Sequence, residues 1–282
     1  LATCTCFLCF ANPHFRAGVH YFSCLAPTSI MSSTQLTNSP DDETTTRDLQ
    51  EFYGADAAKT YNEMMADEMP KVECDLELLI KALLDEKQGG DDDEGGGTIL
   101  DVCCGTGDYL LWLSKQQSED VRSFTLRGMD LSQDMLQLAR DKLSSSSPAI
   151  ELNQGTMENL QDSIPDESCA AVLCNFSIHH LKDCRKVFQE AYRVLKPNTG
   201  LYYLSFWEQG GQDEKIEQKQ EQPDGATVTT YHHNHLELKK MLGDVGFLVV
   251  GRDTLSYREV KEEIYPGFSM NAAYLLVRKR GS

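Results

Sequence analysis

The stretch TILDVCCGTGDYL, residues 98–110, decides the fold of this chain. It begins as an apolar strand, reaches the acidic Asp101 at the strand end, and continues into a turn with Gly105 and Gly107 that opens a helix. In a doubly wound sheet such a turn lies at the carboxyl end of a central strand, where ligands bind. The turn lacks the GK[ST] of a phosphate loop and the third glycine of a dinucleotide fingerprint. It predicts a ligand-binding turn, with a tight turn that binds nothing as the alternative.

A second acidic residue, Asp130, ends the next strand-like run, SFTLRGMD at 123–130. A carboxylate at this place can accept hydrogen bonds from both ribose hydroxyls of a nucleoside. The other interpretation is that Asp130 caps the following helix, but Ser132 is better placed for that role. Together the two strand ends predict a nucleoside-containing ligand more strongly than either does alone.

The rest of the chain repeats the strand–helix pattern. Helices are predicted over 107–117, 132–143, 182–195 and 235–247, the last stopped at Gly246, and apolar strand-like runs stand between them. This alternation predicts an α/β fold with a doubly wound parallel sheet covered on both faces. Two closing runs, 247–257 and 272–279, have no long helix between them and predict an antiparallel pair at the sheet edge.

Two helices and two polar inserts complete the organisation. Residues 47–70 predict a helical cap that ends at Pro70, and 72–87 predict a second helix with Leu76, Leu79 and Leu83 on one face. The segments 88–97 and 208–225 are rich in Gly, Gln and acidic residues, so we expect flexible, solvated inserts there.

Three segments resemble the successive motifs of class I S-adenosylmethionine-dependent methyltransferases. They are ILDVCCGTGDYL (99–110), LRGMDLSQDMLQLARDKL (126–143) and AAVLCNFSIHHLKDCRKVFQEAYRVLKPNTGLYYL (170–204). Within that superfamily they are similar to the quinone-biosynthesis-type enzymes and related small-molecule methyltransferases. The resemblance implies a Rossmann-like methyltransferase fold, with a seven-stranded, mostly parallel sheet whose final strand is reversed. It also implies S-adenosyl-L-methionine as the cofactor.

The resemblance assigns most of the cofactor site. It implies that Asp101 and the turn from Gly105 to Gly107 hold the methionine moiety and that Asp130 holds the ribose. The full predicted set of cofactor-binding residues is Asp101, Cys103, Gly105, Gly107, Asp130, Leu131, Met157, Glu158 and Asn175. Cys103 stands where the family usually has Gly or Ala. Met157 and Glu158 stand where it commonly has Asp and a small residue beside the adenine.

Histidines and aromatic residues are the candidates for the acceptor side. His179 and His180 follow the fourth strand and can supply a general base near the transferred methyl, or else pack and cap locally. Tyr53, Tyr61 and Trp207 lie in regions that close over the cofactor in the family, with ordinary core packing as the alternative. The run YHHNH at 231–235 matches no zinc-ligand spacing, so no metal is predicted.

The function that these motifs predict is methyl transfer from S-adenosylmethionine to a small-molecule acceptor. The formal net charge of −18 argues against avid nucleic-acid binding. Two alternatives stay open, a tRNA wobble-uridine-type methyltransferase and a non-catalytic cofactor-binding scaffold on the same fold. The identity of the acceptor, the methylated element and the oligomeric state are not fixed by the sequence.

The N-terminal segment is distinct in composition. Residues 1–30 hold four of the ten cysteines and no acidic residue, and Met31 opens a polar run. We expect 1–46 to be disordered, as a targeting remnant or translated upstream sequence, and 47–282 to be the methyltransferase domain. No apolar run approaches a membrane span, and ten cysteines in a chain of this length predict reduced thiols. A cytoplasmic location is expected, or an organellar one if 1–30 is a targeting segment.

Overall fold

The computed structural model describes residues 46–89, 96–116, 118–146, 149–208, 217–221, 227–248, 256–265 and 268–281. The expectations for the N-terminal segment up to residue 45, and for 90–95, 209–216 and 222–226 of the two inserts, lie outside the described residues. Within the described ranges, strands and helices alternate along the chain as predicted.

The strands are β1 (Thr98–Val102), β2 (Thr125–Asp130), β3 (Glu151–Gln154), β4 (Cys169–Asn175), β5 (Leu201–Glu208), β6 (Glu217–Glu221), β7 (Thr227–Tyr231), β8 (Phe247–Leu248), β9 (Ser256–Tyr265) and β10 (Phe268–Lys279). The helices are α1 (Thr46–Phe52), α2 (Ala55–Gly89), α3 (Asp108–Ser114), α4 (Glu119–Arg122), α5 (Gln133–Leu143), α6 (Arg185–Val194) and α7 (His235–Val245), with a 3-10 turn, η1 (Ile178–His180).

The main sheet has the strand order β3-β2-β1-β4-β5-β10-β8, and β9 pairs with β10 outside this path. Strands β1 to β5 pair in parallel, whereas β10 runs antiparallel to β5, β8 and β9. The predicted seven-stranded, mostly parallel sheet with a reversed final strand is therefore confirmed. The chain order reverses direction across the sheet at β1 and β4, which is where an α/β sheet of this kind leaves a crevice for a ligand.

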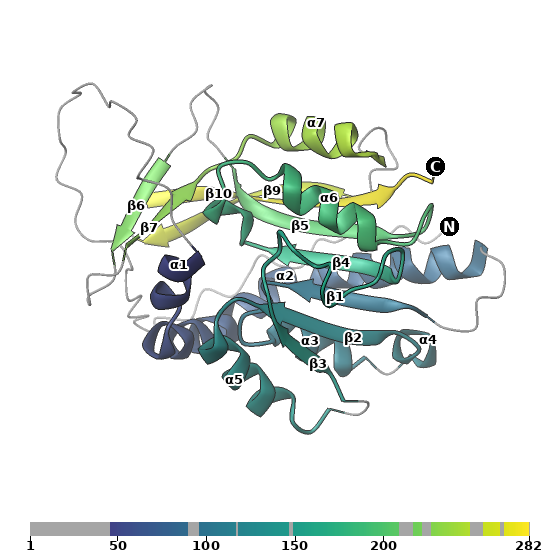
Figure 1. Ribbon diagram of the computed structural model, residues 1–282, viewed down its shortest axis with the longest axis horizontal. Coiled ribbons are helices and arrows are strands. Elements are labelled where there is room, and N and C mark those ends of the chain that lie inside the picture. Colours follow the sequence, from purple (N-terminus) through teal and green to yellow (C-terminus); the bar gives the residue numbers. More distant parts are fainter. Residues whose placement is uncertain are drawn as a thin grey trace, which may run out of the picture.

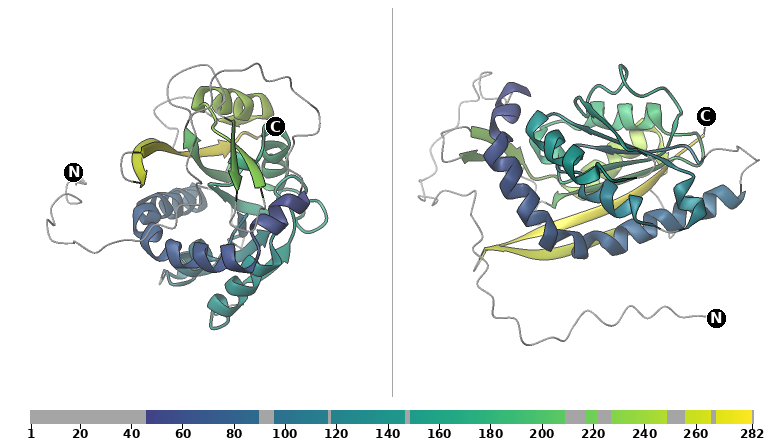
Figure 2. Two further views of the ribbon diagram at one scale, coloured as in Figure 1. Left: turned by 90° about the vertical axis from the view of Figure 1, so that its left-hand side faces the viewer. Right: turned by 90° about the horizontal axis from the view of Figure 1, so that it is seen from below.

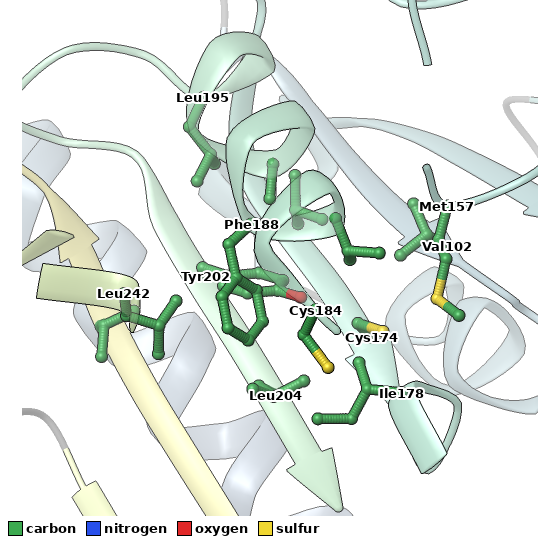
Figure 3. Packing of buried hydrophobic residues seen from close by; sticks show 14 of the residues in the cluster. Val102, Met157, Cys174, Ile178, Cys184, Phe188, Leu195, Tyr202, Leu204 and Leu242 are labelled. Atoms are coloured by element: carbon green, nitrogen blue, oxygen red, sulfur yellow. The ribbon is translucent and has the colours of Figure 1, made fainter. Parts of the chain in front are cut away.

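Helices cover both faces of the sheet (Figure 1). Side chains of β5 alternate between the two faces, so Tyr202 and Leu204 pack against α6 and α7 while Leu201 and Tyr203 pack towards α2. Figure 3 shows Phe188 of α6 over Tyr202, with rings 6.1 Å apart. Each such apolar side chain contributes about 1.5–3 kcal/mol to the stability of the fold when it is fully buried.

Helix α2 runs along the other face (Figure 2). Its Leu76, Leu79 and Leu83 are buried in one cluster with β1, β4 and β5, as the sequence predicted. The predicted stop at Pro70 is wrong, because α2 continues through this residue. Buried apolar side chains on either side of the proline hold both halves of the helix against the sheet, which offsets the lost hydrogen bond. The break in the cap falls instead at Tyr53 and Gly54, between α1 and α2.

The second polar insert also differs from the expectation. Its residues 217–221 form β6, which pairs antiparallel with β7. Strand β7 has the sequence TVTTY, and its Val228, Thr229 and Thr230 are buried, so a β-branched run provides the partner that β6 needs. Among the helices of the described residues, none combines the length and the hydropathy that a bilayer crossing requires.

Candidate functional site

A pocket opens at the carboxyl ends of β1, β2 and β4, beneath the link between α1 and α2. It encloses about 850 Å³ when its open mouth is included. The predicted site residues that line it are Tyr53, Tyr61, Cys103, Gly105, Asp130, Leu131, Met157, Glu158, Asn175 and His180. Another hollow, of about 610 Å³ with its open mouth included, lies between α6 and α7, away from all of these residues.

The turn after β1 takes left-handed backbone conformations that favour glycine. Gly105 has φ 51°, and a Cβ there would come within 3.0 Å of the Tyr61 ring, so only glycine lets the backbone approach this ring. Gly107 has φ 78°, but its missing Cβ makes room for Leu143 and Ala139 of α5. Gly105 therefore shapes the pocket, while Gly107 serves the packing of α5 against the turn.

Asp130 ties two turns together at the pocket wall. Its Oδ2 accepts a hydrogen bond from the Gly105 N–H at 2.8 Å, and its Oδ1 accepts one from the Ser132 N–H at 2.9 Å. Burial raises the pKa of this carboxyl, and the backbone N–H donors of Ser132, Gly105 and Leu131 act in the opposite direction. Each carboxylate oxygen can accept a further hydrogen bond, so the group can still bind a ligand hydroxyl.

Asp101 is a buried carboxyl without a partner. It is 1% exposed, and neither of its carboxyl oxygens has a hydrogen-bond partner. Burial raises its pKa well above the ordinary value, and the charges of Asp130 and Asp108 raise it further. Burial raises the pKa of Tyr61, and nearby charges, those of Asp101 and Asp130 among them, raise it further, so the three groups lie close together. A cationic ligand group would satisfy this arrangement.

The segment after β4 forms another wall. Asn175 receives a hydrogen bond on Oδ1 from the Ser205 hydroxyl at 3.1 Å, while its buried Nδ2 has no partner. Ser177 donates to the Asn175 carbonyl at 2.7 Å, which holds the turn that leads into η1. Phe176 lines the pocket and packs against Trp207, with ring centroids 4.7 Å apart. Trp207 itself lies behind Phe176 and is not among the lining residues.

The two candidate histidines occupy different places. His180 lines the pocket, and its Nε2 lies 2.8 Å from the Tyr53 hydroxyl in a hydrogen bond. Burial lowers the pKa of His180 to about 4, so its imidazole is neutral near pH 7. His179 packs on the His180 ring at 4.0 Å and does not line the pocket. Burial and the neighbouring His180, His233 and His232 lower the pKa of His179 well below its ordinary value.

The YHHNH run lies beside η1 and α7 in supporting roles. The His233 Nε2 is 3.0 Å from the Ile178 carbonyl oxygen, which connects β7 to η1. The His235 Nδ1 is 2.9 Å from Glu208 Oε1, at the start of α7. In the part of the chain that the structure describes, no group of three or more His, Cys, Asp or Glu side chains is placed to hold a metal ion.

Sequence reasoning missed several lining residues. These are Thr46, Leu49, Met135, Gly155, Thr156, Phe176, Ser177 and Leu181. Phe176 and Ser177 directly follow the predicted Asn175, so the strand-end rule could have found them. Thr46 and Leu49 reach the pocket only because α1 folds back over it, which no local pattern reveals. Conversely, Asp101, Gly107, His179 and Trp207 were predicted but do not line the pocket.

Comparisons with known proteins agree with this geometry. Residues 99–198 match a family model described as a methyltransferase domain. Demethylmenaquinone methyltransferases from Listeria monocytogenes and Bacillus licheniformis are 33% and 37% identical to this chain over 107 and 109 residues. Residues 99–198 are therefore similar to a methyltransferase domain. The alignments cover 38% and 39% of this chain but only 43% and 44% of those relatives.

Solved structures show the same fold. A SAM-dependent methyltransferase from Methanosarcina mazei has a TM-score of 0.52 at 19% identity, covering 66% of this chain and 93% of that one. The [4+2]-cyclase SpnF has a TM-score of 0.51 at 19% identity, covering 67% of this chain and 77% of that one. The second likeness shows that this methyltransferase fold also occurs in a protein named for another reaction.

The described residues fit the cofactor that the domain implies. Asp101 is a buried carboxyl that lacks a partner, and S-adenosylmethionine carries an ammonium group. Asp130 presents a carboxylate at the pocket wall, and Asn175 has an unpartnered buried Nδ2 donor. Gly105 lets the backbone approach where a Cβ would collide with Tyr61.

Proposed function

We propose that this chain is an S-adenosylmethionine-dependent methyltransferase that acts on a small, uncharged or cationic molecule. The observation that carries the proposal is the pocket at the carboxyl ends of β1, β2 and β4, whose charged lining residues are Asp130 and Glu158. Such a lining attracts cations and offers nothing to a phosphate chain. The formal charge of −18 acts in the same direction over the whole chain.

In this proposal the chain's own residues bind and orient. Asp130 holds the ribose hydroxyls and Met157 packs beside the adenine. Asp101, which does not line the ligand-free pocket, pairs with the ammonium group once the ligand is bound. When bound, the cofactor supplies an electrophilic sulfonium methyl, so alignment of a nucleophile is the main task. Positioning of this kind can contribute about 7–11 kcal/mol.

The acceptor side is proposed to be the wall of Tyr53, Tyr61, Phe176 and His180. Three aromatic rings favour a flat, ring-containing acceptor. The relatives named demethylmenaquinone methyltransferases support an aromatic acceptor of the quinone type as one candidate. A histidine with a pKa near 4 is a weak base, so we propose that His180 orients the Tyr53 hydroxyl rather than removing a proton.

A labelled-methyl assay tests the proposal. Full-length chain and methyl-labelled S-adenosylmethionine are incubated in parallel with a small-molecule metabolite extract and with bulk tRNA. We expect label in low-molecular-weight products only, and about background label with Asp130→Ala. Label in tRNA would favour the wobble-uridine alternative. Cofactor binding without label in either fraction would favour the scaffold alternative.

A further inference from the structure

Ser132 joins three parts of the site. It is 3% exposed and follows Asp130 in the loop that leads into α5. Its N–H donates to Asp130 Oδ1 at 2.9 Å, and its Oγ accepts a hydrogen bond from the Met135 N–H at 3.2 Å, capping α5. The same hydroxyl donates to the Tyr53 backbone carbonyl at 2.6 Å. One residue therefore contacts Asp130 through its backbone, and the start of α5 and the cap through its hydroxyl.

Tyr53 carries this connection to the opposite wall. Its carbonyl lies on the Ser132 side, and its ring reaches across so that the hydroxyl meets His180 Nε2 at 2.8 Å. Asp130, Tyr53 and His180 all line one pocket. A continuous hydrogen-bonded path thus runs from the carboxylate of β2, through Ser132 and Tyr53, to η1.

Helix α1 of the cap lies against β7 and against the Asp130–Ser132 loop. Helix α1 has seven residues, which is too short to be stable alone, and Phe52 is its one buried residue. It lies beyond the carboxyl ends of the parallel strands (Figure 1). A second, longer contact from Gln50 Nε2 to the Leu131 carbonyl, at 3.5 Å, reaches the same loop as Ser132. The Asp130–Ser132 loop therefore helps to fix the position of α1, together with β7.

We propose that Ser132 is a positioning residue that couples the cofactor side of the pocket to its cap. A ligand held by Asp130 fixes the loop, Ser132 then fixes the Tyr53 carbonyl, and the Tyr53–His180 pair is held in place over the acceptor. This inference rests on the proposed function for the identity of the ligand. The hydrogen bond between Ser132 and the cap does not depend on the proposed function.

Hydrogen exchange of the full chain, measured by mass spectrometry, tests the proposal with and without S-adenosylhomocysteine. Ser132→Ala removes both bonds of the hydroxyl. Ser132→Asp keeps an acceptor for the Met135 N–H but has no proton to donate to Tyr53. Ser132→Thr keeps both bonds. Asn234→Ala is the matched control, because Asn234 caps α7 through the Leu236 and Glu237 N–H groups.

We expect amides in 47–54 of the ligand-free Ala and Asp variants to exchange about fivefold faster than in the wild type. A factor of this size corresponds to the loss of one neutral hydrogen bond. The Thr variant and the Asn234 control should match the wild type in this segment. S-adenosylhomocysteine should slow exchange in 47–54 of the wild type and the Thr variant, and leave the segment unchanged in the Ala and Asp variants.

The ligand-free and ligand-bound measurements distinguish a failure of the Ser132 contact from a failure of the coupling or of the proposed function. Equal ligand-free exchange in all variants would overturn the tie between Ser132 and the cap. Binding of S-adenosylhomocysteine that leaves 47–54 of the wild type unprotected would overturn the coupling while keeping the proposed function. Lack of binding to the wild type would overturn the proposed function and the coupling together, and the ligand-free comparison would still decide the tie.

Discussion

Asp101 and Asp130 both end a strand of the sheet, yet their surroundings differ. Asp130 accepts two backbone hydrogen bonds, from Gly105 and Ser132, that stabilise its charged form. Asp101 has no hydrogen-bond partner, and its charged form is costly in the ligand-free chain. One carboxyl is thus held in its charged form by backbone donors, whereas the other is buried with no hydrogen-bond donor beside it.

The ribose role proposed for Asp130 is tested by Asp130→Ala. We expect at least tenfold weaker binding of S-adenosylmethionine, because charge-assisted hydrogen bonds contribute about 1.5–3 kcal/mol. Asp134→Ala is the control, since it removes the same charge from an exposed position four residues along the chain. Equal affinities of the two variants, measured by calorimetry, would refute the ribose assignment.

The unfavourable burial of the charged Asp101 carboxylate predicts a pH dependence of stability. Between the unfolded-state pKa of Asp, about 4, and its raised folded-state pKa, the folded chain holds a proton that the unfolded chain has released. The free energy of unfolding therefore falls as pH rises through this window. In Asp101→Asn that loss should disappear, so the ligand-free variant should gain stability over the wild type from about pH 4 towards neutrality. Parallel denaturation profiles of the two proteins against pH would contradict this.

Sequence patterns predicted the strand-end residues and missed the contacts between distant segments. Asp130, Gly105 and Asn175 were found because a strand end places its next side chain in the crevice. The Tyr53–His180 hydrogen bond joins residues 127 positions apart, and no periodicity connects them. Gly107 was assigned to the ligand, although its missing Cβ makes room for α5. Both kinds of glycine look alike in a sequence.

At the scale of elements, the ends of the cap helices are set by packing and not by local helix propensity. Pro70 predicts a helix end, and the structure runs α2 through it. The break lies at Tyr53 and Gly54, where the Tyr53 carbonyl bonds to Ser132 instead of continuing a helix. Strand β6 was missed for a similar reason, since its polar sequence becomes a strand only when β7 pairs with it.

Pro70→Ala tests how α2 tolerates its proline. Residue 70 is exposed, so the change removes no buried contact and restores a helical N–H donor. We expect the free energy of unfolding to rise by about 1–3 kcal/mol in urea denaturation. Lys81→Ala, on an exposed position of the same helix, should change it by less than about 0.5 kcal/mol. A loss of stability in Pro70→Ala would show that the fold requires a kink there.

At the scale of the whole molecule, the sheet was the most predictable feature. Alternating strand and helix patterns leave few arrangements open, and right-handed crossovers reduce them further. The two closing runs predicted an antiparallel pair at the sheet edge, and the resemblance implied a reversed final strand; the insertion of β10 between β5 and β8 was not predicted. The enclosure of the pocket was not predictable in detail, because it depends on how α1 lies across strands far away in sequence.

The central claim is that this pocket binds S-adenosylmethionine, and isothermal titration of the full chain with that compound tests it most directly. The account predicts saturable binding at one site per chain, with the heat of binding lost or the affinity at least tenfold weaker in Asp130→Ala. A titration of correctly folded chain that gives no binding heat at several temperatures, with no rise in melting temperature on adding the compound, would contradict it.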